Sequence, residues 1–276
     1  MTLPTIPEPI KRQVRQEAGF GCCKCGLPII QYHHIVKDSE DPEDLMLLCP
    51  LHHHEATVKA MLEKRQRFHK ANPFNIQKGF IEGQLKVNQY IPVINIGSNQ
   101  FVGDGDFIIV DDESLLSIQI NENKLELSMK LYDKEDKLIA DIFRNEWISG
   151  DPFPWDLEFK FQWLRIRRKL RDIQLEIDAR KYPINIRADM WRYGQNFNLT
   201  PNALIFNGVK KNIGVNNFCL VALRLEVNIP EKSFSIAPDP RFGKGKLVVR
   251  ANLRERIQEG IENWKELSRN HALGRL

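Results

Sequence analysis

Three cysteines and one histidine near the start of the chain have the types and the spacing of metal ligands. Cys22 and Cys25 form a C-x-x-C pair followed by Gly26, and Cys49 and His52 form a C-x-x-H pair. A gap of two residues lets both side chains of a pair turn onto one ion, and two such pairs supply the four ligands of tetrahedral zinc. The sequence therefore predicts a structural zinc site. The alternative is a set of four buried side chains that bind no metal.

The segment around these two pairs contains more histidines than one closed zinc site needs as ligands. His33 and His34 lie between the pairs, and His53 and His54 follow the last zinc ligand directly. This surplus predicts a second metal site. The sequence does not separate His53 from His54, although the offset from the zinc ligand favours His53. Cys23, inside the first pair, is expected to be a bystander.

Three stretches carry a resemblance to a known family. They read CCKCG at 22–26, HHIV at 33–36 and DLMLLCPLHHHEAT at 44–57. In this order and spacing they resemble the HNH endonucleases, whose McrA-like members bracket a ββα-metal unit with zinc knuckles. The resemblance covers residues 20–58, about a seventh of the chain.

The resemblance implies a role for each surplus histidine. His34 resembles the general base, and His33 and His53 resemble the ligands of a catalytic Mg²⁺ or Mn²⁺. Phosphodiester hydrolysis is served by a base with a near-neutral pKa and by a divalent cation that neutralises developing charge. One position departs from the family, because Asp44 stands where relatives have Asn. An ionised carboxylate cannot donate a hydrogen bond, so Asp44 either loses a bracing contact or joins the metal's ligands.

The elements that have to position these residues follow from the local pattern. Residues 10–20 predict a short amphipathic helix, and the β-branched run at 22–36 predicts a hairpin. Residues 54–72 predict one helix that ends before Pro73, with one apolar face made by Val58, Met61, Leu62 and Phe68. The zinc would take the place of a large core, which a unit of ~50 residues can hardly build alone.

The remainder of the chain changes character after this segment. Residues 79–106 are rich in Gly, Asn and Gln, which predicts a linker. Strand-length alternating pieces follow from 107 to 235, and a helical pattern occupies 250–270. We expect an α+β protein: a zinc-stabilised ββα-metal (HNH) domain at 1–78, the linker, and a mostly antiparallel β domain at 107–276 that ends in an amphipathic helix.

Composition narrows the class of protein. With 276 residues, 42% hydrophobic and 28% charged, the chain is unlike collagen-like or disordered sequences. No apolar run approaches the ~18 residues that span a bilayer, and the charged start lacks a signal-peptide core, so we expect a cytoplasmic protein with no membrane partner. A net charge of +4 allows DNA binding only through local patches. The basic runs at 54–70 and 160–171 are candidates, and their alternative is a solvated or paired surface.

The resemblance implies a metal-dependent endonuclease that hydrolyses DNA, with zinc as its structural metal, in the manner of a bacterial restriction or anti-phage effector. Two alternatives stay open: a zinc-stabilised nucleic-acid-binding protein whose active site has decayed, and an interaction protein whose β domain drives oligomer formation. The β domain itself matches no family that we recognise. It is expected to select DNA targets, to sense an activating ligand or partner, or to form a homo-oligomer.

Overall fold

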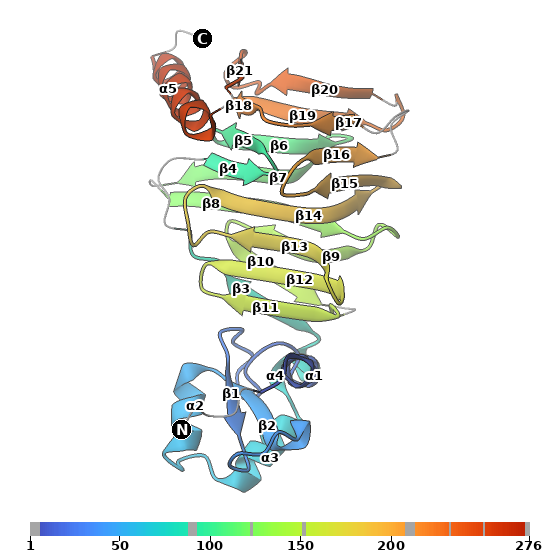
Figure 1. The fold of residues 1–276 in the computed structure, drawn as a ribbon, viewed down its shortest axis with the longest axis vertical. Coiled ribbons are helices and arrows are strands. Elements are labelled where there is room, and N and C mark those ends of the chain that lie inside the picture. The colour runs from blue at the N-terminus through green and yellow to red at the C-terminus, as the bar shows by residue number, and fades with distance from the viewer. Residues whose placement is uncertain are drawn as a thin grey trace.

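The computed structural model describes residues 6–87, 93–121, 124–150, 153–207, 213–231, 233–250 and 252–273. It has the α+β fold that the sequence predicts (Figure 1). The helices are α1 (Glu8–Glu17), α2 (Pro50–Thr57), α3 (Glu63–Ala71), α4 (Phe74–Lys78) and α5 (Leu253–Ala272), with the 3-10 turn η1 at Pro42–Asp44. The strands are β1 (Gln31–His34), β2 (Leu45–Leu48), β3 (Phe80–Gln84), β4 (Val93–Ile96), β5 (Asn99–Val102), β6 (Gly105–Val110), β7 (Glu113–Asn121), β8 (Lys124–Tyr132), β9 (Leu138–Phe143), β10 (Glu146–Gly150), β11 (Asp156–Lys160), β12 (Trp163–Lys169), β13 (Asp172–Asp178), β14 (Ile184–Arg192), β15 (Gln195–Leu199), β16 (Leu204–Asn207), β17 (Ile213–Val215), β18 (Cys219–Val221), β19 (Leu223–Asn228), β20 (Ser233–Pro238) and β21 (Lys246–Val248).

The N-terminal unit, residues 6–79, carries the cysteine and histidine pairs. Its β1 and β2 form an antiparallel hairpin in which His34 pairs with Leu45, and α2 follows β2 directly. All four residues of β2 are fully buried. They belong to a small core to which α1 contributes Val14 and α2 contributes Ala56. The unit therefore has a β–β–α order with little apolar material to hold it.

The single helix predicted over 54–72 is wrong. The chain instead forms α2 and α3, and between them Lys59 has a φ of +60°, a left-handed conformation that interrupts a right-handed helix. The expected apolar face is consequently split. Only Met61 of that face is buried, and the exposed fractions are 56% for Val58, 66% for Leu62 and 61% for Phe68.

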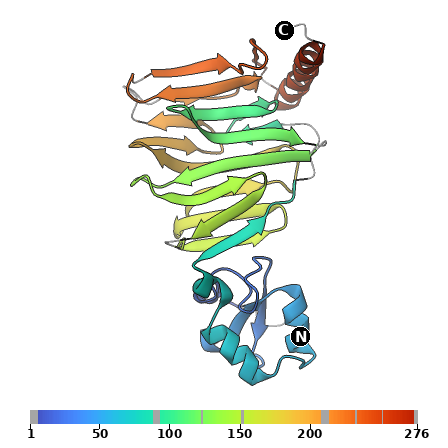
Figure 2. The same ribbon diagram turned by 180° about the vertical axis from the view of Figure 1, so that it is seen from behind.

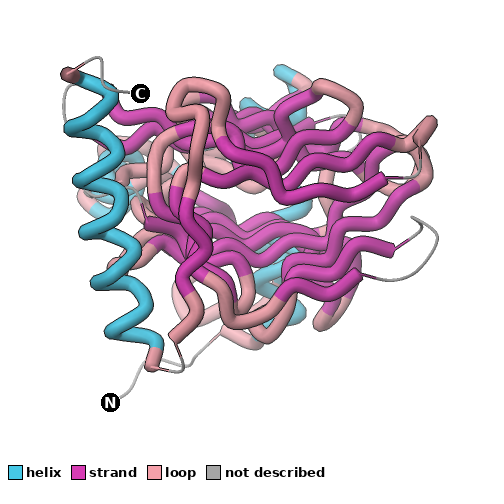
Figure 3. The backbone as a smooth tube through the Cα atoms, turned by 90° about the horizontal axis from the view of Figure 1, so that it is seen from above, coloured by secondary structure: helices cyan, strands magenta, loops and turns pink. Residues whose placement is uncertain are grey.

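The remaining strands build two sheets packed face to face, which we call the β-sandwich (Figure 3). One sheet has the order β20-β19-β6-β7-β8-β9-β10-β3, and the main path of the other is β11-β12-β13-β14-β4-β5-β18-β21. Pairing is mostly antiparallel, as predicted, and the exceptions are the parallel pairs β4–β14, β5–β18 and β6–β19. Side chains from both sheets form one large core between them.

Residues 79–106 do not form the predicted linker. They contain β3 at the edge of one sheet and the hairpin of β4 and β5 inside the other. The glycines that suggested flexibility lie at tight points instead: a Cβ on Gly103 would meet the Trp264 ring at 2.9 Å. The apolar run at 218–227, which was expected to be one strand, forms parts of two strands. It changes sheets at Ala222, so that β18 and β19 belong to different layers.

The C-terminal helix α5 confirms the predicted amphipathic pattern. Ile261, Trp264 and Leu267 are buried against β5, β18 and β21 at the end of the β-sandwich farthest from the N-terminal unit (Figures 1 and 2). The helix is fastened by Arg256, which is 4% exposed and donates to Gln100 and to three backbone carbonyls. Among the described residues, no helix combines the length and the apolar character needed to cross a bilayer.

The N-terminal unit packs on the β-sandwich through α1. Arg15 donates from Nε and Nη2 to the two carboxylate oxygens of Asp156 on β11, each at 2.9 Å, and both side chains are buried. Arg15 also donates to the Tyr32 hydroxyl at 2.7 Å, and Arg167 donates to Asp156 at 2.7 Å. Phe20 adds an apolar contact with Phe153. A buried polar network thus joins the two parts of the chain.

Candidate metal centre

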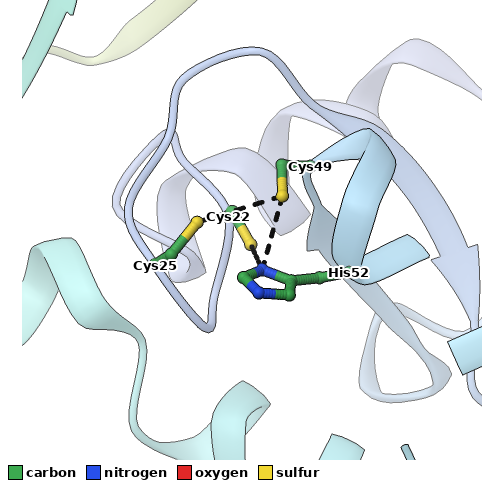
Figure 4. A group of neighbouring side chains, drawn as sticks. All are labelled: Cys22, Cys25, Cys49 and His52. Carbon is green, nitrogen blue, oxygen red and sulfur yellow. Dashed lines mark hydrogen bonds between the residues drawn. The ribbon is translucent and has the colours of Figure 1, made fainter. Parts of the chain in front are cut away.

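Figure 4 shows the four predicted zinc ligands converging on one point. Their donor atoms all lie within 4.8 Å of one another. The Sγ atoms of Cys22 and Cys49 are each 3.3 Å from Nδ1 of His52, and Cys25 Sγ is 3.9 Å from Cys49 Sγ. Among the described residues this is the one group of three or more metal-binding side chains that meets this distance limit. The two pairs, which have 23 residues between them in the sequence, therefore form a single cluster.

These separations fit the edges of a zinc tetrahedron. With Zn–S near 2.3 Å and Zn–N near 2.0–2.1 Å, a regular tetrahedron has S···S edges of about 3.8 Å and S···N edges of about 3.5 Å. The observed distances of 3.9 and 3.3 Å lie close to both values. Three thiols and one imidazole are also a donor set that zinc prefers. The group could bind a zinc ion.

Local backbone structure places the ligands. Cys49 is the N-cap of α2, with Pro50 after it, so the first turn brings His52 back beside it. The Cys22–Cys25 turn is closed by a hydrogen bond from Gly26 N to Cys22 O at 2.7 Å. Gly26 has a φ of +78°, which favours glycine, and a Cβ there would meet Asn75 Oδ1 at 2.3 Å.

Protonation matters because only the thiolate binds a metal. Burial raises the pKa of the Cys22 thiol, while backbone N–H groups of Cys49, Lys24 and Cys25 act in the opposite direction. Burial raises the pKa of Cys25 to about 12. The pKa of His52 is lowered by burial, which favours the neutral ligand form of its ring. Binding of a cation here must therefore displace thiol protons, and folding and metal affinity are coupled.

Two contacts that support the cluster could not be predicted from the sequence, because each joins residues that are far apart in the chain. Asn75 on α4 is 3% exposed, and its Nδ2 donates to the carbonyls of Gly19 and Gly26, each at 3.0 Å. Lys24 donates to Glu55 on α2 at 2.7 Å and ties the Cys22–Cys25 turn to that helix. Cys23 lies outside the ligand group, as expected. Its side chain is buried, and burial raises its pKa to about 11.

Two of the surplus histidines meet next to this cluster. The rings of His33 on β1 and His53 on α2 lie edge to face with centroids 5.2 Å apart. His54, which the sequence leaves as an alternative to His53, is exposed and makes no such contact. His33 is also 3.2 Å from Gln66 on α3, through its Nε2. Its pKa is lowered, mainly by burial, so the neutral ring is favoured near pH 7.

His34, the predicted base, ends β1 and is partly exposed. In the described part of the chain its ring has no hydrogen-bond partner, although it is near enough to His33 to influence that residue's pKa. The strand is anchored just beyond it, where Ile35 N donates to Asp44 O at 2.7 Å. The imidazole of His34 is thus presented on a fixed backbone with both nitrogens free.

Asp44 is engaged by neighbours other than the histidines. Its Oδ1 accepts from Arg67 Nη2 at 2.7 Å, and its Oδ2 accepts from Ser39 Oγ at 2.8 Å. These two contacts lower its pKa. Asp44 is not in the ligand group at the cysteines, and it braces the loop between β1 and β2. A carboxylate can brace this loop because its partners, Arg67 and Ser39, are both donors.

Both predicted basic surfaces are partly paired with acids in the structure. On the β-sandwich, arginines of the run 160–171 are paired with acids of neighbouring strands: Arg165 with Glu176, Arg167 with Asp156 and Glu158, and Arg168 with Asp172 and Asp189. In the N-terminal unit, Arg67 and Lys70 are paired with Asp44 and Glu17. Lys59, Lys64 and Arg65 are exposed and have no ion-pair partner among the described residues. On the β-sandwich, Lys160, Lys169 and Arg171 are likewise exposed and have no ion-pair partner among the described residues, so both runs keep exposed cations that are not paired.

Comparison with family models, with curated proteins and with solved structures gives no match for this chain.

Proposed function

We propose that the N-terminal unit is an HNH-type, metal-dependent endonuclease that hydrolyses DNA phosphodiester bonds. The observation that carries this proposal is the contact between His33 and His53, with the unhindered His34 beside it, on a β–β–α frame that includes the four zinc ligands. Two imidazoles in edge-to-face contact could each supply a nitrogen ligand to one divalent cation. A third, without a hydrogen-bond partner, is suited to accept a proton.

Each group would have a separate task. His34 would take the proton of the attacking water, because its imidazole has no hydrogen-bond partner among the described residues and can accept one. His33 and His53 would hold Mg²⁺ or Mn²⁺, which when bound neutralises charge on the scissile phosphate and stabilises the leaving oxygen. The Cys22–Cys25 turn and the start of α2 would share a structural zinc, which fixes His53 relative to the hairpin.

Charge near the histidines supports a nucleic-acid substrate. Lys59, Lys64 and Arg65 are exposed and make no ion pair with the described residues, so they are available to contact phosphates. Contacts of this kind position a duplex without reading its sequence. The paired arginines of the β-sandwich are a weaker candidate, because binding a phosphate there would require breaking existing ion pairs.

The test is cleavage of supercoiled plasmid by the zinc-loaded full-length protein in Mn²⁺ or Mg²⁺. We expect His34→Ala to lower the rate by about 10²–10⁴-fold, the usual contribution of a general base, and to leave DNA binding intact. His53→Ala should also abolish cleavage. The matched control is His54→Ala, which removes an exposed imidazole one residue away and should cut like the wild type.

Two results would contradict the proposal. If His54→Ala and His53→Ala lose activity equally, the metal site is not the His33–His53 pair. If the wild type binds duplex DNA but does not cut it with either metal, the chain is a zinc-stabilised nucleic-acid-binding protein whose site has decayed.

A further inference from the structure

Gln66, which lies outside the region of family resemblance, is buried beside the histidine pair. It sits on α3, is 7% exposed and has a polar amide that needs partners in this environment. Its Nε2 lies 2.7 Å from the backbone oxygen of Met61, and its Oε1 lies 3.2 Å from Nε2 of His33. The side chain therefore bridges the backbone before α3 to a histidine of β1.

The orientation of this amide follows from the chemistry of its neighbours. The Met61 carbonyl can only accept a hydrogen bond, so the group facing it must be the NH₂ of Gln66. The opposite orientation would place two acceptor oxygens 2.7 Å apart. The amide oxygen is thereby directed at His33, and it can only accept. His33 must then carry a proton on Nε2, which in the neutral ring leaves the lone pair on Nδ1.

We propose that Gln66 is a positioning residue that holds His33 as the Nε2–H tautomer and keeps Nδ1 available as a metal ligand. The metal part of this inference rests on the proposed function, whereas the tautomer does not. Metal-binding histidines commonly donate their second N–H to a carbonyl or carboxylate, which fixes the ring and strengthens the ligand. In this chain α3 supplies that acceptor, so α3 belongs to the site although it follows the β–β–α frame.

The variants that test this keep or remove the acceptor. Gln66→Leu has no acceptor for His33. Gln66→Glu retains an acceptor but gives up the donor to Met61, so it should lose stability while retaining the tautomer. Gln77→Leu makes the same substitution at an exposed glutamine of α4 and serves as the matched control.

Two measurements on the zinc-loaded full-length protein separate the effects. Long-range ¹H–¹⁵N spectra of histidine-labelled protein report the tautomer of His33, and electron paramagnetic resonance reports the affinity for Mn²⁺. We expect the wild type, Gln66→Glu and Gln77→Leu to show the Nε2–H tautomer. Gln66→Leu should lose that fixed state and weaken Mn²⁺ binding about 10–100-fold, the range for loss of a supporting partner. Zinc content should not change.

The outcomes distinguish this inference from the proposed function. An Nδ1–H tautomer in the wild type, or Mn²⁺ affinity in Gln66→Leu equal to that of the wild type, would overturn the role of Gln66. If Mn²⁺ affinity falls in proportion to the loss of stability in both Gln66 variants, Gln66 has only a structural role, and the positioning role is overturned as well. If the tautomer behaves as expected but the wild type binds no Mn²⁺, the positioning of His33 stands and the nuclease proposal fails.

Discussion

The buried ion pair between Arg15 and Asp156 should control how the N-terminal unit is held on the β-sandwich. Asp156 is 2% exposed and accepts three hydrogen bonds, two from Arg15 and one from Arg167. In Asp156→Ala, the Arg15 guanidinium stays buried with the Tyr32 hydroxyl as its remaining hydrogen-bond partner among the described residues. An unpaired buried charge is expensive, so the variant should release α1 from β11.

The size of the effect follows from burial. Removing one partner of a buried pair costs about 3–5 kcal/mol, because the other charge is left without compensation. The matched control is Asp178→Ala on the same sheet, where Asp178 pairs with the half-exposed Arg180. A surface pair of that kind contributes about 0–1 kcal/mol. Replacing both buried partners with apolar residues, Arg15→Met with Asp156→Leu, should restore most of the loss, because no charge then stays buried.

Urea denaturation of the zinc-loaded protein gives the free energies of unfolding, and limited proteolysis near Gly79, at the junction of α4 and β3, reports undocking. We expect Asp156→Ala to lose several times more stability than Asp178→Ala and to be cut faster. Equal losses for the two variants, or a double variant no more stable than Asp156→Ala, would refute the assignment of the docking energy to this ion pair.

Four further predictions concern the cluster, the glycine turn, the last helix and His33. Cys49→Ser should lose the zinc and unfold the N-terminal unit, whereas Cys23→Ser should keep about one zinc per chain by elemental analysis, and equal zinc loss would contradict the ligand assignment. Gly26→Ala should lower the free energy of unfolding by more than about 1 kcal/mol, because the added Cβ clashes and the backbone is strained. The control is Gly79→Ala, which has a similar φ of +83° but nothing within 4 Å of the added Cβ, and which should lose only the part that is due to backbone strain. Arg256→Ala should lower the free energy of unfolding by about 3 kcal/mol and speed hydrogen exchange in α5, because it leaves buried acceptors unpaired. Unchanged exchange would contradict the role of Arg256 in holding α5. The His33 ring should titrate below pH 6.5 by NMR, because its pKa is lower in the folded protein than in the unfolded chain. The folded state then binds fewer protons than the unfolded chain, so the free energy of unfolding should fall as the pH drops below 6.5. A midpoint above pH 6.5 would contradict this prediction.

Prediction from sequence was most successful where the signal is local. The two-residue gaps within Cys22–Cys25 and Cys49–His52 confine each pair to one turn of backbone, so the zinc cluster could be expected before its tertiary setting was known. The pattern of α5 was equally local, since an apolar face repeats every three or four residues. The predicted linker and the single helix at 54–72 failed because glycine content and apolar spacing do not report what the chain packs against.

The chain by itself determined which side chains can bind a metal and how the last helix faces its core. The tertiary structure decided which groups meet. It placed His53 rather than His54 against His33 and brought Gln66 within hydrogen-bond distance of His33. It also paired Asp44 with Arg67, and the arginines of β12 with acids from β11, β13 and β14. Chelating geometry is set within a few covalent bonds, whereas the partner of a buried polar group is set by distant segments that the fold brings together.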